Sequence, residues 1–346
     1  MGITETAGAI DLHAHWTPGS ALAACARSEP WHGIEMGRTA DGLPTAVLSG
    51  KTVTFASSDL HFSGLDARVP AMDLDEVEVQ VLSLLPQLFG YDQEPSAAAR
   101  YCAAVNDELA EELRSGPTGR FLGLGAVPLG SPAGAVVELR RCVEELGLAG
   151  IAVGTNVRGS RWASDELWPL LEAAEALRAV VFLHPNAPSG YPIPDAYRLR
   201  NVFGNPADTT IVLQVLAFSG ALERFPGLRL VAAHGGGYTA MALGRMEHSW
   251  RMRSESKARA TISPREALAN VTVDTVVHSP EGLRFIVEAF GADNVVVGTD
   301  FPADMGLASP TTFVREAFAD DPHIADQVLN GNARRLLDAR DAVVPA

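Results

Sequence analysis

Cysteine is scarce in this chain of 346 residues, which has only Cys25, Cys102 and Cys142. An odd and scattered set argues against a secreted domain stapled by disulfides, and it contains no metal-binding pair of the CxxC type. It suits a reducing compartment, in which thiols pack as small hydrophobic groups. We therefore expect a cytoplasmic protein.

Long apolar runs and positive charge are also lacking. No stretch approaches the roughly 18 apolar residues that a membrane span needs, and the first residues do not follow the pattern of a signal peptide. The 27 Lys and Arg are outnumbered by 42 Asp and Glu, which gives a formal net charge of -15. We expect no membrane and no nucleic-acid partner, because such a surface repels phosphate. An anionic substrate stays open, since an arginine or a bound cation can reverse the field inside one pocket.

What the chain does contain is a globular balance of 47% hydrophobic and 20% charged residues. Eight apolar, β-branched runs alternate with amphipathic segments, a pattern typical of a parallel sheet covered by helices. The runs lie at residues 9–13, 79–84, 121–128, 149–153, 180–184, 228–234, 271–274 and 295–300. Helices are expected near 95–115, 132–146, 165–177, 208–224, 237–254, 264–269 and 279–290, with a C-terminal helical group from about 310 to 340.

This alternation predicts an α/β fold, a distorted (β/α)8 TIM barrel, with 1–346 as a single domain. A doubly wound open sheet would alternate in the same way, but it would gather its site at one switch point rather than from several distant strands. Residues 30–70 do not fit the repeat and predict an insertion after the first strand, a small β-ribbon or lid. Residues 186–206 contain four prolines and predict a long irregular loop over the site.

Two histidines end the first predicted strand. His13 and His15 are spaced i and i+2, so on an extended segment both imidazoles point to the same side. Two neutral imidazoles on one side can chelate Zn²⁺ or a similar ion. The alternative is that they are ordinary polar residues at a strand end.

His184 and Asp300 strengthen the metal interpretation, because each follows an apolar strand without a break. A buried histidine or aspartate needs a partner to offset its desolvation, and one cation would serve all of them. Three imidazoles and one carboxylate suit a single divalent ion, Zn²⁺ in first place and Mn²⁺ as the other candidate, with a position left for water. We therefore predict metal ligation by His13, His15, His184 and Asp300.

His234 ends the sixth predicted strand and is followed by three glycines, which allow the backbone to turn tightly. It could be a fifth ligand or a histidine with a purely structural hydrogen bond. We prefer it as the general acid or base beside the metal-bound water, because imidazole titrates near neutrality. His234 and Asp300 are the predicted catalytic residues.

Candidates for substrate contacts follow these positions. Arg245 lies on the helix after His234 and offers a fork for a carboxylate, although it could equally be a solvated helix charge. The other three lie close to the predicted metal ligands, where they could also serve as packing: Trp16, Asn186 and Phe301. Five further histidines end no strand. Among them His248 is expected on a helix surface, and His61 reaches the site only if the insertion folds over it.

Several motifs together resemble the amidohydrolase superfamily, in particular the branch of aminocarboxymuconate semialdehyde decarboxylase and related aromatic-acid decarboxylases. They run in family order from residue 9 to about residue 338, and they include Asp11-Leu-His-Ala-His15, Phe182-Leu-His-Pro185, Ala233-His-Gly-Gly-Gly237 and Gly298-Thr-Asp-Phe-Pro302. The resemblance implies a barrel with one Zn²⁺, or Mn²⁺ in some relatives, held by the four predicted ligands. It implies His234 as the catalytic histidine, and a homodimer in which Arg245 reaches the substrate of the other subunit.

The chain departs from this branch at two positions. The decarboxylase has a substrate-binding arginine after the first strand, whereas residues 52–59 offer none, and Asn186 stands where family members often have an aromatic residue. We expect non-oxidative decarboxylation of an unsaturated or aromatic carboxylic acid, a small-molecule substrate. Metal-dependent hydrolysis of an amide, ester, lactone or C-C bond is the alternative, and a catalytically silent binding protein is a third.

Overall fold

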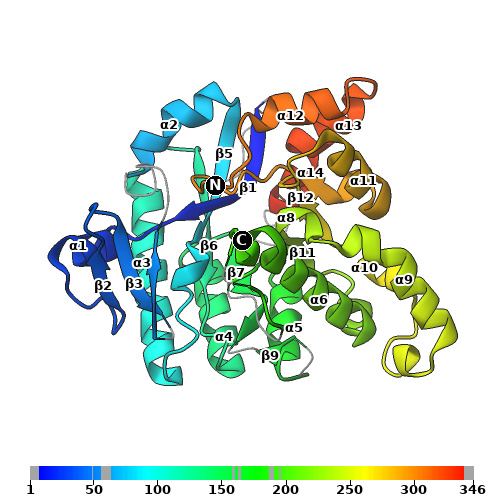
Figure 1. Cartoon of the computed structure of the whole chain (residues 1–346), viewed down its shortest axis with the longest axis horizontal. Coiled ribbons are helices and arrows are strands. Elements are labelled where there is room, and N and C mark those ends of the chain that lie inside the picture. The colour runs from blue at the N-terminus through cyan, green and yellow to red at the C-terminus, as the bar shows by residue number, and fades with distance from the viewer. Residues whose placement is uncertain are drawn as a thin grey trace, which may run out of the picture.

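Eight parallel strands form one sheet in the order β1-β5-β6-β7-β10-β11-β12-β13 (Figure 1). The computed structural model describes residues 8–48, 50–55, 64–157, 160–162, 165–186, 191–194 and 196–338. The strands are β1 Ala9–Trp16, β5 Val77–Leu84, β6 Phe121–Ala126, β7 Gly150–Gly154, β10 Val180–His184, β11 Arg229–Ala232, β12 Thr272–Asp274 and β13 Val295–Val296. Each of them coincides with one of the eight predicted runs.

The first and last strands of this order also meet. Leu12 N donates to Val297 O at 2.8 Å, and His15 N donates to Phe301 O at 2.7 Å. These bonds bring the two edges of the sheet together, so the eight strands form a nearly closed barrel. The predicted (β/α)8 TIM barrel is confirmed, and its distortion lies at this seam, where β13 is only two residues long.

Helices surround the barrel (Figure 1). The α-helices are α1 Gly19–Arg27, α2 Leu65–Leu74, α3 Pro95–Ser115, α4 Pro132–Arg140, α5 Trp168–Ala176, α6 Asn205–Phe218, α7 Ala221–Arg224, α8 Ala233–Gly236, α9 Thr239–Met252, α10 Pro264–Leu268, α11 Pro280–Phe290, α12 Pro310–Ala317, α13 Pro322–Asp326 and α14 Asn332–Asp338. Short 3-10 or π segments are η2 Pro86–Leu88, η3 Arg141–Glu145, η4 Asp165–Leu167, η5 Arg200–Gly204, η6 Glu255–Lys257, η7 Ala292–Asn294 and η8 Gln327–Gly331. The helix expected at 208–224 is divided, because Gly220 adopts a left-handed conformation (φ 81°) between α6 and α7.

The segment after the first strand forms the expected ribbon. Strands β2 Glu35–Arg38, β3 Pro44–Leu48 and β4 Lys51–Thr54 make an antiparallel sheet, which contacts α1 and stands to the side of the barrel (Figure 1). A second small pair, β8 Asn156–Val157 and β9 Ser160–Arg161, follows β7. The helices α1 and α2 were not predicted, and α2 begins inside the range assigned to the insertion.

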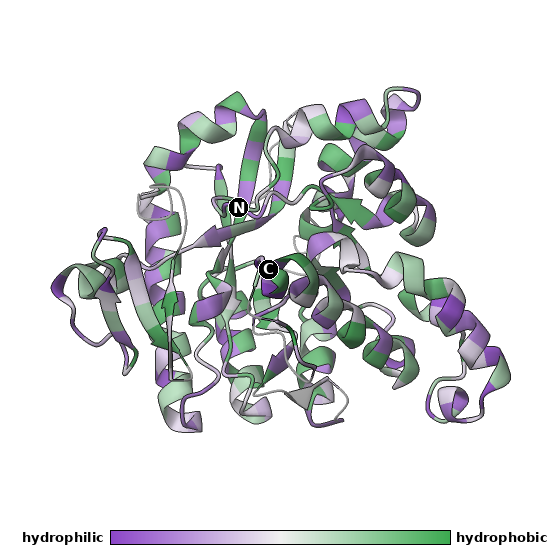
Figure 2. Ribbon diagram, viewed as in Figure 1, coloured by the Kyte–Doolittle hydropathy of each residue, from purple (hydrophilic) through white to green (hydrophobic). Residues whose placement is uncertain are grey.

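The core lies in and around the barrel. Figure 2 shows the central strands mostly in the hydrophobic colour, whereas the surrounding helices alternate between hydrophobic and hydrophilic residues. All three cysteines are free and buried, as the sequence predicts for thiols that pack as small hydrophobic groups. Among the described residues no helix is long and apolar enough to cross a membrane.

Candidate metal centre

Four imidazoles and one carboxylate meet where several strands of the barrel end. His13 and His15 come from β1, His184 ends β10, His234 follows β11, and Asp300 follows β13. The two imidazoles of β1 approach each other with 3.2 Å between their Nε2 atoms. Asp300 Oδ1 lies 3.2 Å from His13 Nε2 and 2.9 Å from His15 Nε2. The sequence separates these residues by up to 287 positions, and the fold brings them together.

A set of ligand atoms suited to one ion can be drawn from this cluster. One ligand atom from each of His13, His184, His234 and Asp300 lies within 4.8 Å of all the others. This geometric group contains His234, whereas the sequence assigned the fourth place to His15. We retain His15 because its Nε2 is in direct contact with both His13 and Asp300. His15 therefore lies directly against two members of the geometric group.

Hydrogen bonds of the Nδ1 atoms fix which nitrogen of each imidazole faces the cluster. His13 Nδ1 donates to the Asp274 carboxylate at 2.6 Å, and His184 Nδ1 donates to the Pro185 carbonyl at 2.7 Å. Both acceptors lack a proton to give, so each ring carries a hydrogen on Nδ1 and turns its Nε2 toward the cluster. His184 Nε2 is buried and meets no hydrogen-bond partner among the described residues. A cation among these nitrogens would satisfy it, so the residues fit a metal ion.

The proton affinities of the cluster fit the same arrangement. Burial and the neighbouring imidazoles lower the pKa of His184 well below its usual value, so the ring is neutral. Burial also opposes the charged form of His13, but the Asp300 and Asp274 carboxylates outweigh it and raise the pKa of His13 to about 10. The site thus attracts one positive charge to its centre, and without a metal this charge is a proton on His13 Nε2. A metal ion that replaced the proton would leave Nε2 free to ligate.

His234 and Asp300 reach the cluster through unusual backbone conformations. Both adopt positive φ angles, 58° for His234 and 57° for Asp300, which non-glycine residues rarely occupy. Strain of this kind costs about 1–3 kcal/mol and is retained where neighbours hold it in place. The glycines that follow His234 also have positive φ, as the predicted tight turn requires. At Gly237 a Cβ would stand 2.1 Å from Pro206 O, so a side chain cannot be accommodated there.

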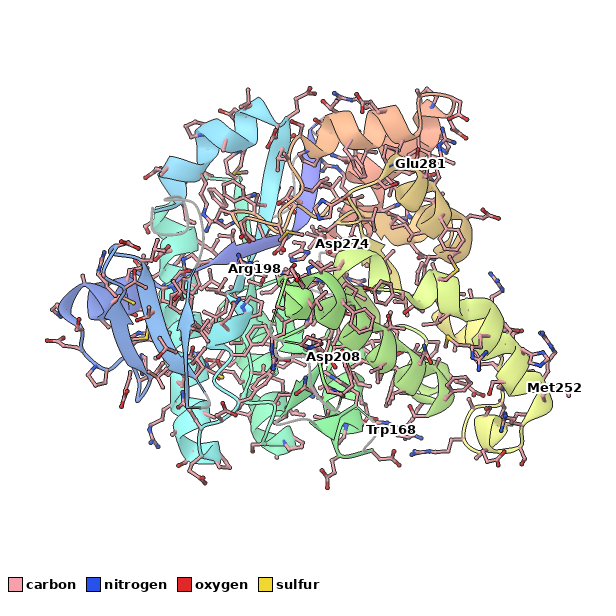
Figure 3. The ribbon with its side chains drawn as sticks, viewed as in Figure 1. Trp168, Arg198, Asp208, Met252, Asp274 and Glu281 are labelled. Carbon is pink, nitrogen blue, oxygen red and sulfur yellow. The ribbon has the colours of Figure 1, made fainter. Side chains whose placement is uncertain are left out.

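Sequence reasoning missed Asp274, which ends β12 and lies near the centre of the view in Figure 3. Its buried carboxylate accepts from His13 Nδ1 and from the backbone N of His234, the latter at 3.0 Å. Its signal was present, because the predicted run 271–274 ends in a carboxylate in the same way as the run ending in Asp300. The rule used for the other strand ends would have found it.

Arg68 of α2 was missed as well, and no sequence signal marks it. Its side chain is 1% exposed, Nη2 donates to the carbonyl of His15 at 2.6 Å, and the guanidinium lies 5.5 Å from the centre of the Phe301 ring. Burial lowers the pKa of Arg68 to about 10, which still leaves it charged at neutral pH. It therefore braces the end of the strand that carries two of the imidazoles.

The four residues predicted to contact substrate differ in burial and in how close they lie to the cluster. The Trp16 indole is buried and donates from Nε1 to Glu112 at 2.8 Å. Phe301 and Asn186 are half-buried beside the cluster residues that they follow in sequence. Arg245 is exposed on α9 and is outside the cluster. His248 lies exposed on the same helix, as expected, while His61 lies outside the described residues.

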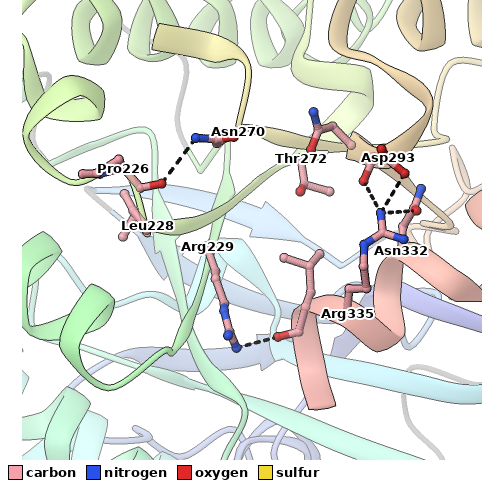
Figure 4. Close-up of a pocket in the computed structure, with 11 residues that line it drawn as sticks. Pro226, Leu228, Arg229, Asn270, Thr272, Asp293, Asn332 and Arg335 are labelled. Atoms are coloured by element: carbon pink, nitrogen blue, oxygen red, sulfur yellow. Dashed lines mark hydrogen bonds and ion pairs between the residues drawn. The ribbon is translucent and has the colours of Figure 1, made fainter. Parts of the chain in front are cut away.

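A hollow elsewhere in the molecule has a different character. It lies where β11 and β12 begin, next to α14, and its lining includes Arg229, Asn270, Thr272 and Arg335 (Figure 4). Arg335 is held by Asp293, and Arg229 donates to the carbonyl of Leu336. None of the five cluster residues lines it. It lies at the amino-terminal end of the strands, where polar contacts in such barrels serve stability rather than catalysis.

The chain is similar to known proteins over nearly its whole length. Residues 10–339 match the family model described as Amidohydrolase. A 2-amino-3-carboxymuconate-6-semialdehyde decarboxylase of Dictyostelium discoideum is 36% identical, over 79% of this chain and 76% of the relative. Among solved structures, the apo form of IDCase from Metarhizium anisopliae is 22% identical with a TM-score of 0.81, covering 98% of this chain and 99% of that one.

A further similar structure contains a metal. It is a dihydroxybenzoic acid decarboxylase of Polaromonas with bound manganese and the inhibitor 2-nitroresorcinol, 22% identical with a TM-score of 0.74. The match covers 96% of this chain and 97% of that one. At such identity the two structural matches establish a shared fold.

Proposed function

The chain belongs to the amidohydrolase family, and from this premise we propose that it is a metal-dependent decarboxylase of an unsaturated or aromatic carboxylic acid. The observation that carries the proposal is the cluster of four imidazoles and one carboxylate at the strand ends, with a buried His184 Nε2 that meets no partner in the described part of the chain. Two relatives that match over most of the chain, at 79% and 97% of its length, are decarboxylases, which favours loss of CO2 over the other reactions of the family.

The proposed ligands are His13, His15, His184 and Asp300, with Zn²⁺ as the first candidate ion and Mn²⁺ as the second. Imidazole nitrogens and one carboxylate suit either ion, and the manganese in the Polaromonas decarboxylase supports the second. When bound, a divalent ion supplies positive charge that stabilises the negative charge developing on the substrate.

His234 is the proposed proton donor. In decarboxylation a proton is added to the carbon that bears the carboxylate, that carbon becomes tetrahedral, and the C-C bond then breaks to release CO2 and restore the unsaturated bond. The His234 ring is half-buried, its Nε2 lies 3.7 Å from Asp300 Oδ2, and Asp274 holds its backbone. A ring fixed in this way can deliver a proton to one place without reorganising. Asp300, beside it, completes the proposed catalytic pair.

The remaining proposals concern the substrate and the assembly. Trp16, Asn186 and Phe301 are proposed to line the substrate pocket. Arg245 is proposed to bind the substrate carboxylate of a partner subunit in a homodimer. This assembly is supported by exposed apolar side chains on and near α9, the helix that carries Arg245, because large exposed apolar patches mark interaction surfaces. They are Val202, Phe203, Tyr238, Met241 and Met252.

We also propose one domain over residues 1–346 and a cytoplasmic location. The single domain is supported by the sheet, whose strands come from both ends of the described chain and share one core. The location is supported by the three free, buried cysteines.

Incubation of the metal-loaded protein with a panel of unsaturated and aromatic acids tests the function. We expect CO2 release from at least one acid, and a fall in kcat of roughly 100- to 10,000-fold in His234→Gln because the proton donor is removed. His248→Gln, the same change on the exposed face of α9, is the control and should keep wild-type kcat. A product that has gained water instead of losing CO2 would identify a hydrolase, and release of no CO2 from any acid contradicts the proposal.

A further inference from the structure

The Asn186 amide holds an unused hydrogen-bond acceptor next to the metal cluster. Its Nδ2 donates to the backbone carbonyl of Asn156 at 3.3 Å. Because a carbonyl oxygen can only accept, this contact fixes which end of the amide is nitrogen. The other end, Oδ1, is buried and receives no hydrogen bond from the described residues.

Tyr91 supplies a complementary group at the same place. Its hydroxyl accepts from the backbone N of Gly154 at 2.9 Å, and its own hydrogen has no acceptor within the described ranges. Burial raises the pKa of the phenol, so it keeps that hydrogen. A Cβ at Gly154 would stand 2.6 Å from Asn186 Oδ1 and 2.7 Å from Tyr91 Cε2. The two side chains therefore meet in the space that glycine leaves open.

The ladder between two strands places this pair beside the cluster. Gly154, the last residue of β7, pairs with His184, the last residue of β10. His184 presents its own unpartnered Nε2 at the same end of the barrel. Buried polar atoms without partners are rare in folded proteins, and each one calls for an explanation such as an absent ligand. Here one acceptor and one donor lie next to each other at the end of the barrel where the reaction is proposed.

We propose that Asn186 and Tyr91 form a subsite for a neutral hydrogen-bond donor, a hydroxyl or amino substituent, on the substrate acid. Asn186 Oδ1 accepts the O-H or N-H of this substituent, and the Tyr91 hydroxyl donates to its lone pair. The inference rests on the proposed function, which supplies the acid. An acid without the substituent leaves a buried acceptor unpaired, and sites of this kind discriminate strongly against the analogue that lacks the group.

Calorimetric titration of the metal-loaded protein with salicylate, anthranilate and benzoate tests the subsite. We expect the hydroxyl-bearing or amino-bearing acid to bind roughly 10- to 100-fold more tightly than benzoate, since that is the range for one unsatisfied buried acceptor. Asn186→Leu should abolish this preference by weakening only the substituted acid. The control is Asn270→Leu, the same change at an exposed residue of the hollow in Figure 4. This variant should keep the preference for the substituted acid over benzoate. If Asn186→Leu does not fold, Asn186→Ala replaces it.

The outcomes separate the subsite from the reaction. A preference that survives in the Asn186 variant overturns the proposal, and so does a wild-type protein that binds the three acids equally or binds none of them. Comparison of salicylate with anthranilate shows whether the hydroxyl or the amino group is preferred. Binding is read without turnover, so a protein that shows the preference but releases no CO2 from any acid would contradict the proposed function and leave the subsite standing.

Discussion

Asp274 connects the two halves of the candidate site through one carboxylate. Oδ2 accepts from the His13 ring at 2.6 Å and from the backbone N of His234 at 3.0 Å, while Oδ1 accepts from Gly235 N at 2.9 Å and Val276 N at 3.0 Å. The first contact turns His13 Nε2 toward the centre, and the backbone contacts hold the left-handed turn at His234. A residue outside the proposed ligand set thus sets the orientation of two that are proposed to act.

Replacing Asp274 with asparagine should lower the affinity of the site for a metal ion without leaving a cavity in the core. Its amide keeps the shape but loses the charge that fixes the His13 ring, and changes in such outer partners lower metal affinity or activity by roughly 10- to 100-fold. Competition with a chelator measures the affinity. Asp293→Asn, the same change at an exposed position, should leave it unaltered. An Asp274→Asn protein with wild-type affinity and kcat would contradict this role.

At this scale the sequence predicts the residues that end strands and misses those that reach the site from elsewhere. His13, His184 and Asp300 could be identified because each interrupts an apolar run where burial requires a partner. Arg68 could not, because its burial follows from contacts with the His15 carbonyl and the Phe301 ring, which are determined by how α2 packs. Whether the identified residues ligate a metal is still a prediction.

Among the elements, the seam between β1 and β13 determines whether the barrel closes. Asp11 of β1 is fully buried, and its carboxylate accepts from Gln80 Nε2 of β5 at 3.1 Å and from the hydroxyl of Thr299 at 2.6 Å. It also accepts from the backbone N of Thr299 at 3.1 Å and of His13 at 3.0 Å. One side chain therefore joins three chain segments next to the proposed ligands.

Removal of the Asp11 carboxylate should destabilise the whole domain. Asp11→Ala removes the acceptor of four buried hydrogen bonds, so we expect the free energy of unfolding to fall by roughly 2–5 kcal/mol. Urea denaturation measures the change. Asp41→Ala, at an exposed position in the three-stranded sheet's connecting turn, should change it by less than about 0.5 kcal/mol. Equal stabilities of the two variants would show that Asp11 does not hold the seam.

The elements themselves follow from the sequence more closely than their ends do. All eight strand runs and the long helix at 95–115 are predicted, because apolar periodicity reflects burial directly. The runs 228–234 and 295–300 are longer than β11 and β13 because the backbone leaves the sheet early to form the left-handed turns at His234 and Asp300. The helix α1 was missed although Ala21, Ala24 and Cys25 recur on its buried face, because its nine residues make a short element between the first strand and the insertion.

At the scale of the whole molecule, the barrel carries an apolar surface on one side. Met241 and Met252 of α9 are 75% and 70% exposed, and Figure 3 shows Met252 at the end of the helix that projects farthest from the barrel. Near the start of the same helix, Tyr191, Phe203, Ile211 and Tyr238 line an apolar groove. A second copy covering this side would remove these groups from water, which is favourable at about 25 cal/mol per Å² of apolar surface.

A charge on this surface should therefore weaken the proposed homodimer. Met241→Glu places a carboxylate where the partner would pack, so sedimentation should show a shift from dimer toward monomer. Leu74→Glu makes a comparable change at an 84% exposed residue at the end of α2 and should leave the assembly unchanged. A wild-type protein that sediments as a monomer, or a Met241→Glu protein that remains fully dimeric, would contradict this assignment of the interface.

The most direct test of the proposed function is whether CO2 release depends on a bound metal ion. Protein stripped of metal with a chelator should release no CO2 from an acid that the loaded protein decarboxylates. Titration with Zn²⁺ or Mn²⁺ should then restore the rate in proportion to added ion, up to a break at one equivalent per chain, because one ion is proposed among His13, His15, His184 and Asp300. Full CO2 release from the metal-free protein would contradict the account.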